Sequence, residues 1–392
     1  MKTLIFSISA GDGHKQTSLA IKDYILLNDK NSEVIIVDTL SYISPTLNKL
    51  VIGSYIKSLK INPSIYGRLY YKIDSSKKLS VLKGSSKLGR LFSLKLKKLI
   101  YEFNPDIIIS THPIPTEMLS MLKTRGNMKI PVITIITDYA AHNLWLHKGI
   151  DVYITPNNDM INEMITKGID KDKIYNLGIP VNPNFFKKYD KSVTLKSLNL
   201  SPMKFTILVM GGSLGMGRII DLYKELDKIK ADIQIIIATG KNNRLYCQLM
   251  KLKSNCLKET RVLKYTREIN KYMQACDVLI TKPGGITITE AMLSSIPLIL
   301  FSPIPGQEEK NIDFLVKNHL AINLNDIEEC KNTINTLITN PAYLQKIKQN
   351  YVNYIKPHSG NDIYNLINSL SAKDNLYEFS FNKNKFCTSS ES

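Results

Sequence analysis

Short runs of β-branched and other apolar residues recur along the chain, and longer stretches of mixed polar and apolar residues separate them. Buried strands of parallel sheets have such sequences, and helices connect them in βαβ units. A first series of runs covers residues 3–9, 33–39, 106–111, 131–137 and 151–155. A second series covers residues 205–210, 233–239, 261–266, 278–282 and 297–301. The pattern predicts an α/β protein of two doubly wound, Rossmann-like domains that face a cleft.

The segment between the two series, residues 178–190, contains a glycine, two prolines and asparagines. Such residues favour turns and connections, so we interpret the segment as a hinge between domains. The length of 392 residues suits two domains of ordinary size. A hydrophobic fraction of 43% and a charged fraction of 22% are typical of a globular protein with a sizeable core.

The five cysteines form no C-x-x-C pair, and none precedes Cys247. This spacing indicates neither a disulfide framework nor a zinc module, and it favours a reducing cytoplasm. Asp12 and His14 interrupt the first apolar run too early for a signal peptide, so we interpret that run as a strand. No uncharged apolar stretch approaches the roughly 18 residues of a membrane span. Any membrane contact is therefore expected to be peripheral.

Basic residues outnumber acidic ones by 52 to 34, which gives a net charge of +18. This charge predicts an anionic partner: a nucleic acid, a phosphorylated substrate or an anionic membrane surface. Residues 48–100 hold thirteen of the basic residues and one acid, Asp74, with tyrosine, leucine and isoleucine between them. Interfacial membrane segments combine cations and apolar residues in this way. A solvated helical face is the alternative.

A glycine-containing turn, Gly11 to Gly13, follows the first apolar run and leads through His14 into a helix-compatible stretch, residues 15–27. Ligands of open α/β sheets bind at such strand ends, where helix N-termini offer free N–H groups to anions. A surface histidine near a tight turn is the alternative for His14. The chain contains no G-x-x-x-x-G-K-[ST] motif, and the turn lacks the third glycine of the dinucleotide motif.

The second half contains two more glycine-rich turns after strands, in residues 209–217 and 282–290. Their backbones can wrap phosphate oxygens, and Glu290 can accept hydrogen bonds from the two hydroxyls of a ribose. An incidental acid in the first turns of a helix is the alternative. Residues 303–311 gather amide and acid groups suited to sugar hydroxyls. We interpret the D-x-D triplet at Asp170 to Asp172 as a solvated turn and expect no metal site.

Taken in order, these motifs closely resemble those of the monogalactosyldiacylglycerol synthase and processive diacylglycerol glucosyltransferase family. The resemblance extends from Ser9 to about Leu370 and rests on GDGH, STHP, TDYAAHNLW, LGIPVNPNF, MGGSLGMG, ATGKN, VLKYT, CDVLITKPGGITITEA and PIPGQEEKN. One departure is Asp12, where the family often has a glycine before the histidine.

The resemblance implies a glycosyltransferase-B fold. Residues 1–180 would bind diacylglycerol and the membrane, residues 181–353 would bind the UDP-sugar, and a helix in residues 354–372, kinked at Pro357, would cross back to the first domain. We expect residues 373–392 to form a flexible tail. The implied reaction transfers a hexose from UDP-hexose to 1,2-diacylglycerol with inversion. UDP-glucose is the first choice of donor and UDP-galactose the second.

The resemblance also assigns residues. His14 is the expected catalytic base, and Asp138 is either an alternative base or a residue that orients the acceptor. The expected donor-binding residues are Gly212, Ser213, Tyr265, Gly284, Gly285, Ile286, Thr287, Glu290, Gln307, Glu308 and Asn311. The expected acceptor or membrane residues are Gly13, Lys95, Lys97, Lys98, His112, Tyr139, His142 and Trp145.

Three other functions are compatible with parts of the pattern. They are a nucleic-acid binder, a transferase that adds N-acetylglucosamine to a lipid-linked cell-wall precursor, and a non-catalytic sensor of UDP-sugar and lipid. The basic segment contains no recognised nucleic-acid module, so we expect no nucleic-acid partner. We expect no cofactor, since the UDP-sugar is a substrate, and a peripheral location at the cytoplasmic face of the cell membrane.

Overall fold

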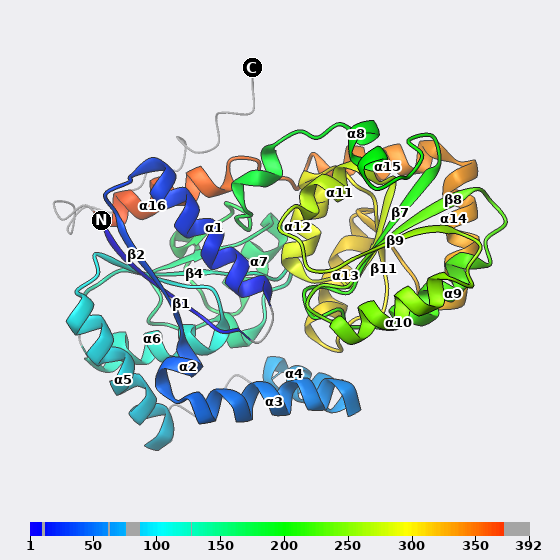
Figure 1. Cartoon of the computed structure of the whole chain (residues 1–392). Helices are drawn as coiled ribbons and strands as arrows, with labels where there is room; N and C mark the ends of the chain where they lie inside the picture. Colours follow the sequence, from blue (N-terminus) through cyan, green and yellow to red (C-terminus); the bar gives the residue numbers. More distant parts are fainter. Residues whose placement is uncertain (10–11, 62, 76–86, 127, 372–392) are drawn as a thin grey trace.

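A computed structural model describes residues 1–9, 12–61, 63–75, 87–126 and 128–371 (Figure 1). The sequence-based interpretations of Gly11, of residues 76–86 in the basic segment and of the tail at residues 373–392 lie outside the described residues.

The first half of the chain forms a six-stranded parallel sheet with the strand order β2-β1-β3-β4-β5-β6. Its strands are β1 (Lys2–Ser7), β2 (Glu33–Asp38), β3 (Ile107–Ser110), β4 (Val132–Ile135), β5 (Val152–Ile154) and β6 (Ile174–Tyr175). Five of them match the five apolar runs of the first series. The sixth, β6, has only two residues, so its pattern is too short to stand out in the sequence.

The second half forms another six-stranded parallel sheet, with the order β12-β11-β10-β7-β8-β9. Its strands are β7 (Phe205–Met210), β8 (Ile233–Ala238), β9 (Glu259–Leu263), β10 (Val278–Thr281), β11 (Leu298–Leu300) and β12 (Ala321–Asn323). Counted within this half, the order is that of dinucleotide-binding Rossmann folds. The short edge strand β12 is again absent from the sequence-based prediction.

Helices connect the strands and cover both faces of each sheet (Figure 1). Those of the first half are α1 (Asp12–Asn28), α2 (Thr39–Ile43), α3 (Pro45–Ile61), α4 (Pro63–Ser75), α5 (Lys87–Phe103), α6 (Pro113–Gly126) and α7 (Asn158–Thr166), with short 3₁₀ turns η1 (Asn143–Trp145), η2 (Lys171–Lys173) and η3 (Pro183–Phe186). Those that follow are α8 (Lys191–Ser197), α9 (Ile219–Asp227), α10 (Asn243–Lys253), α11 (Ile269–Ala275), α12 (Gly285–Leu293), α13 (Gln307–Lys317), η4 (Ile327–Glu329), α14 (Cys330–Thr339), α15 (Pro341–Tyr351) and α16 (Ser359–Ser371).

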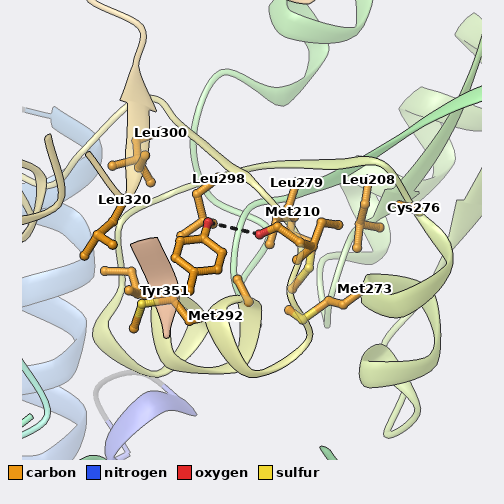
Figure 2. Packing of buried hydrophobic residues seen from close by; sticks show 14 of the residues in the cluster. Leu208, Met210, Met273, Cys276, Leu279, Met292, Leu298, Leu300, Leu320 and Tyr351 are labelled. Atoms are coloured by element: carbon orange, nitrogen blue, oxygen red, sulfur yellow. Dashed lines mark hydrogen bonds between the residues drawn. The ribbon is translucent and has the colours of Figure 1, made fainter. Parts of the chain in front are cut away.

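The central strands are buried on both faces, which explains why their sequences are continuous apolar runs rather than alternating ones. Buried side chains form separate clusters on the two faces of each sheet. Figure 2 shows one such cluster in the second half, in which Leu208, Leu279 and Leu298 of adjacent strands pack with Met292 of α12 and Tyr351 of α15. This packing holds α12 rigidly against the sheet edge.

The last helix, α16, packs on the first sheet although it follows the second in sequence (Figure 1). Ile363 and Ile367 lie in the same buried cluster as Ile5 of β1 and Ile21 of α1. The helix begins at Ser359, after Pro357, rather than continuing through it with a kink. Proline lacks an N–H and clashes with a preceding turn, so a helix start beyond it is the less costly arrangement.

In each sheet the strand order reverses once, between β1 and β3 in the first and between β7 and β10 in the second. Ligands of doubly wound folds bind at the carboxyl ends of the strands at this reversal. The two edges lie against each other. A Cβ placed on Gly285, at the start of α12, would lie 1.9 Å from the carbonyl oxygen of Thr137, just after β4. Only glycine permits this approach of the two halves.

Candidate active site

His14 lies at the reversal point of the first sheet. The sequence predicts it on a loop before a helix, whereas the structure makes it the third residue of α1, which begins at Asp12. Its Nδ1 is 2.8 Å from the carbonyl oxygen of Thr111 and 3.0 Å from the hydroxyl of Thr137. A carbonyl oxygen can only accept, so this geometry assigns the ring proton to Nδ1. Nε2 then carries a lone pair, and no residue in the described part of the chain hydrogen-bonds to it.

The surroundings of His14 keep its ring neutral. Burial lowers the pKa of His14 to about 4, although the hydrogen bond to Thr111 acts in the opposite direction. The His112 ring stands edge-on at 4.6 Å, and its own pKa is held well below the usual value, first by burial and then by His14. His112 uses its Nδ1 to accept from the Ile114 N–H at 3.1 Å. At neutral pH the pair therefore contains no charged imidazole.

Asp138, on the loop after β4, is buried and has partners for both oxygens. The indole Nε1 of Trp145 donates to one oxygen at 3.1 Å, and the side-chain amide of Gln307, from the other half of the chain, donates to the second. Burial raises the pKa of Asp138 to about 6, although both hydrogen bonds favour the ionised form. Asp138 thus links the first half of the site to the start of α13.

Tyr139 and Asn311 also join the two halves. The Tyr139 N–H donates to the Asn311 Oδ1 at 2.8 Å, and the Asn311 Nδ2 donates to the carbonyl of Pro283 at 2.9 Å. The Tyr139 hydroxyl pairs with Thr289 Oγ1 at 2.8 Å, and Tyr139 and Asn311 are both buried. The hydrogen-bonding groups of Tyr139 and Asn311 are therefore occupied within the protein. The predicted contacts of Asn311 with a sugar and of Tyr139 with an acceptor have no support from this geometry.

His142 is a structural group in this arrangement. Its Nδ1 accepts from the Leu144 N–H at 3.1 Å, so Nε2 carries the proton and donates to the Tyr70 carbonyl at 3.0 Å. Its ring stacks on that of Tyr70 at 3.8 Å. Burial lowers the pKa of His142 to about 4, so the ring is neutral and fixes α4 to the loop before η1.

Mainly backbone groups line the second reversal point, between β7 and β10. Gly284 caps α12 without any side-chain hydrogen bond, so the first N–H groups of that helix, at Gly285, Ile286 and Thr287, lack a capping side chain. A Cβ on Gly284 or on Gly212 would meet no atom within 4 Å, and Gly212 has a left-handed φ of 68°. Open space beside uncapped N–H groups is what an anion such as a diphosphate requires.

Glu290 lies one and a half turns into α12 and is partly buried. Burial raises the pKa of Glu290 to about 8. In the described part of the chain its carboxylate has no hydrogen bond or ion pair. A partly buried carboxylate without a protein partner keeps its full capacity to accept hydrogen bonds. Glu290 is therefore available to a ligand with hydroxyl groups.

The loop after β11, residues 302–306, leads into α13, whose first two residues, Gln307 and Glu308, are predicted sugar contacts. Glu308 pairs with Lys282 at 3.1 Å and accepts from the Ile304 N–H at 2.6 Å. Burial raises the pKa of Glu308 while Lys282 opposes that rise. The structure thus gives Glu308 a role in shaping the loop, and Gln307 a role in contacting Asp138.

Two lysines near the second reversal point were not predicted as site residues. Lys282 pairs with Glu308, and Lys241 pairs with Asp12 of the first half at 2.7 Å. The ammonium of Lys241 also lies 5.1 Å from the ring centre of the half-exposed Tyr265. Both lysines belong to motifs quoted above, KPGG and ATGKN, which was the only sequence signal that could have found them. The predicted Gly13 lies nearby, where its Cβ position is 3.8 Å from Ile286.

The predicted membrane residues lie on α5. Lys97 and Lys98 are exposed, and Lys98 makes a loose ion pair with Glu102 at 3.7 Å. Lys95 instead donates to the Ile43 carbonyl at 2.6 Å, so its ammonium is partly engaged. Tyr42, Lys95 and Lys98 line a surface hollow of about 290 Å³. Among the described residues, no helix is both long and apolar enough to cross a membrane.

Solved structures show which class of fold this is. Acinetobacter baumannii MurG matches with a TM-score of 0.62 and 15% identity over 94% of this chain and 99% of its own. Anabaena Alr3699/HepE, solved in complex with UDP-glucose, matches with a TM-score of 0.57 and 15% identity over 94% of this chain and 100% of its own. At this identity the likeness concerns the fold alone. The two sheets and their topology are those of the two-domain glycosyltransferase-B fold, as the sequence predicted.

Sequence comparison shows which families the two halves of the chain resemble. The family described as monogalactosyldiacylglycerol (MGDG) synthase matches residues 14–181, and the glycosyltransferase family 28 C-terminal domain matches residues 206–359. The processive diacylglycerol beta-glucosyltransferase of Bacillus pumilus is 29% identical over 92% of this chain and 93% of its own. That of Bacillus subtilis (strain 168) is 29% identical over 89% of this chain and 90% of its own. Residues 14–181 are thus similar to the MGDG synthase family and residues 206–359 to the family 28 C-terminal domain, which confirms the resemblance.

Proposed function

We propose that the protein transfers a hexose from UDP-hexose to 1,2-diacylglycerol, with inversion, to make a β-hexosyldiacylglycerol. The Bacillus relatives named as processive diacylglycerol beta-glucosyltransferases match over about nine tenths of both chains and support this activity. UDP-glucose is the preferred donor in this proposal, in line with those names, and UDP-galactose is the second. The two sugars differ at one hydroxyl, whose recognition depends on the groups around Gln307.

The single observation that carries the mechanism is the neutral His14 ring. Its Nδ1 proton is held by the Thr111 carbonyl, and Nε2 is unpartnered in the described part of the chain. In the proposed step Nε2 takes the proton of the diacylglycerol hydroxyl. The hydroxyl oxygen attacks the anomeric carbon, and the bond from that carbon to the UDP oxygen breaks. A base of this kind typically contributes 10²–10⁴-fold to the rate.

Asp138 was the alternative base. Both of its oxygens already accept hydrogen bonds, from Trp145 and Gln307. We therefore propose that Asp138 positions those two side chains and leaves proton removal to His14.

The proposed donor site combines the Glu290 carboxylate with the free backbone N–H groups at the second reversal point. Glu290 accepts the ribose hydroxyls, and the N–H groups at the start of α12, with those of Gly212 and Ser213, hold the diphosphate. Helix N-termini stabilise developing negative charge on the leaving group as well as on the bound donor. We propose that these groups hold the diphosphate without a bridging metal ion.

The lipid substrate places the reaction at a membrane. We propose that α5 and its neighbours attach to the anionic cytoplasmic face of the cell membrane through Lys97, Lys98 and exposed apolar groups such as Leu94. Lys95 contributes less in this proposal, since its ammonium already contacts Ile43.

Product analysis tests the proposal directly. The protein is mixed with anionic liposomes that contain diacylglycerol and with labelled UDP-glucose, UDP-galactose or UDP-N-acetylglucosamine in separate reactions. We expect labelled monohexosyldiacylglycerol with a β linkage, formed fastest from UDP-glucose and also in the presence of a chelator. Transfer of N-acetylglucosamine alone, or binding of UDP-glucose without any product, would replace the proposal by the cell-wall transferase or by the sensor.

A further inference from the structure

Helix α4 of the first half lies against the 302–306 loop of the second half. A Cβ on Gly67 would lie 2.7 Å from the Cβ of Pro305, and a Cβ on Gly306 would lie 2.7 Å from the ring of Tyr70. Gly306 has a φ of 95°, in the left-handed region, so both the backbone and the space at this position require glycine. In both contacts a glycine backbone packs closely against a side chain of the opposite half.

The Glu309 carboxylate links the 302–306 loop to α4. The Tyr71 hydroxyl donates to Glu309 Oε2 at 2.8 Å, and the Gly306 N–H donates to the same oxygen at 2.7 Å. The N–H at the turn is thereby satisfied by a side chain that α4 orients. Burial and the neighbouring Glu309 raise the pKa of Tyr71 to about 12, so the hydroxyl keeps its proton and stays a donor.

Asp74, one turn further along α4, makes a second link between α4 and α13. Its carboxylate pairs with Lys310 of α13 and with Lys167 at the end of α7, the latter at 2.7 Å. The Asn143 N–H donates to it at 3.2 Å. Burial would raise the pKa of Asp74, but the hydrogen bonds from the two lysines outweigh it and hold that pKa well below the usual range. With 14% of the side chain exposed, this ion pair is shielded from solvent more than a surface pair is.

The segment that α4 holds is the one that carries the predicted sugar contacts. Gln307 and Glu308 lie between Gly306 and Glu309, and they contact Asp138 and Lys282 respectively. A movement of the 302–306 loop would displace both side chains, because they follow it directly in α13. In the described part of the chain, no hydrogen bond or ion pair joins α4 directly to the uncapped N–H groups of α12 or to the Glu290 carboxylate.

We propose that Tyr71 and Asp74 are positioning residues for recognition of the donor's sugar. From the first half of the chain, they hold the 302–306 loop and the start of α13 in place. The hexose is therefore recognised only when the two halves are in contact. The uridine and diphosphate are bound by the second half alone. This inference rests on the proposed UDP-hexose site.

Calorimetry with UDP and with UDP-glucose separates the two parts of the donor. For Tyr71→Phe and Asp74→Asn we expect the Kd for UDP to stay within twofold of the wild-type value. The ratio of the Kd for UDP-glucose to the Kd for UDP should rise about fivefold, in line with the loss of one hydrogen bond in the support of the loop. With diacylglycerol liposomes, the KM for UDP-glucose should rise by a similar factor.

Matched controls are available for both substitutions. Tyr343→Phe changes a comparably exposed tyrosine on α15. Asp159→Asn changes another carboxylate that faces α13, but its ion pair with Lys317, at 3.5 Å, is exposed. Neither control should alter the Kd ratio. Melting temperatures of all variants show whether each one is folded, and Tyr71→Phe removes only one oxygen atom.

The outcomes are distinct. An unchanged ratio in both variants, with UDP still bound, overturns this inference and leaves the proposed function intact. Equal weakening of UDP and UDP-glucose also overturns it, because that result indicates a general loss of structure at the interface. A wild-type protein that binds neither compound refutes the proposed function and this inference together.

Discussion

The two points at which strand order reverses differ in what fills them. At the first, between β1 and β3, His14 hydrogen-bonds to Thr111, and after the neighbouring strand β4 Asp138 hydrogen-bonds to Trp145 and Gln307. At the second, between β7 and β10, glycines leave open space, helix N–H groups lack caps, and Glu290 has no partner in the described part of the chain.

This difference indicates a division of labour. Groups that carry out chemistry benefit from being held in one orientation before the substrate arrives, because no energy is then spent on reorganisation during the reaction. Groups that bind a ligand must instead have unsatisfied hydrogen-bonding capacity. We therefore expect substitutions at the first reversal point to affect turnover and those at the second to affect donor affinity.

The largest expected effect belongs to His14. His14→Ala should lower turnover roughly 10²–10⁴-fold while UDP affinity stays nearly unchanged, because the base acts on the acceptor and not on the donor. Turnover numbers and UDP affinities of His14→Ala and Asp138→Asn are measured side by side, with the exposed His358→Ala as control. Near-normal turnover in His14→Ala would contradict the assignment. A collapse confined to Asp138→Asn would move the base to Asp138.

Glu290 provides the opposite case. At pH 8.5, where Glu290 is mostly ionised, Glu290→Ala should raise the Kd for UDP roughly a hundredfold, because two hydrogen bonds to a charged acceptor are lost. Glu290→Gln, which keeps one acceptor oxygen, should lose less. Calorimetry measures the affinities, and the exposed Glu328→Ala serves as the control. Unchanged UDP affinity in Glu290→Ala would remove Glu290 from the donor site.

The basic surface of α5 should act on membrane binding and on neither reversal point. Reversal of Lys97 and Lys98 to glutamate should weaken partitioning onto anionic liposomes roughly thirtyfold at low salt, since each cation contributes about 1 kcal/mol. Added salt should weaken the wild-type protein as well. Flotation over a lipid titration measures both effects, with reversal of the exposed pair Lys187 and Lys188 as control. Binding that ignores charge reversal and salt would exclude an electrostatic attachment.

The smallest expected effect is the pH dependence of donor affinity. With a pKa of about 8, Glu290 is mostly protonated at pH 7 and mostly ionised at pH 8.5. If the ionised form binds the ribose, the Kd for UDP-glucose should fall roughly eightfold over this range, as the ionised fraction grows. Glu290→Gln should show no such change. His14 and Asp138, with pKa values of about 4 and about 6, are already mostly deprotonated at pH 7.

The apolar runs predicted the central strands of both sheets because a strand buried on both faces needs apolar residues at every position. They did not reveal β6 and β12, which have two and three residues at the sheet edges and too little burial to impose a pattern. The start of α1 was also placed too late, since Asp12 and Gly13 look like turn residues in the sequence but are the first two residues of the helix.

Local sequence also pointed to His14, Asp138 and Glu290, because glycine turns and strand ends are local features and parallel strands bring their ends to one edge. Only the tertiary structure decided how these groups differ. The tautomer of His14 depends on a carbonyl 97 residues away, and the occupied oxygens of Asp138 depend on a glutamine 169 residues away. Likewise, only the structure shows that the buried Asn311 accepts a hydrogen bond from Tyr139, and that Tyr71 of α4 donates one to Glu309, next to the 302–306 loop. Partners so distant in sequence leave no local pattern, because their contacts exist only once both sheets have folded against each other.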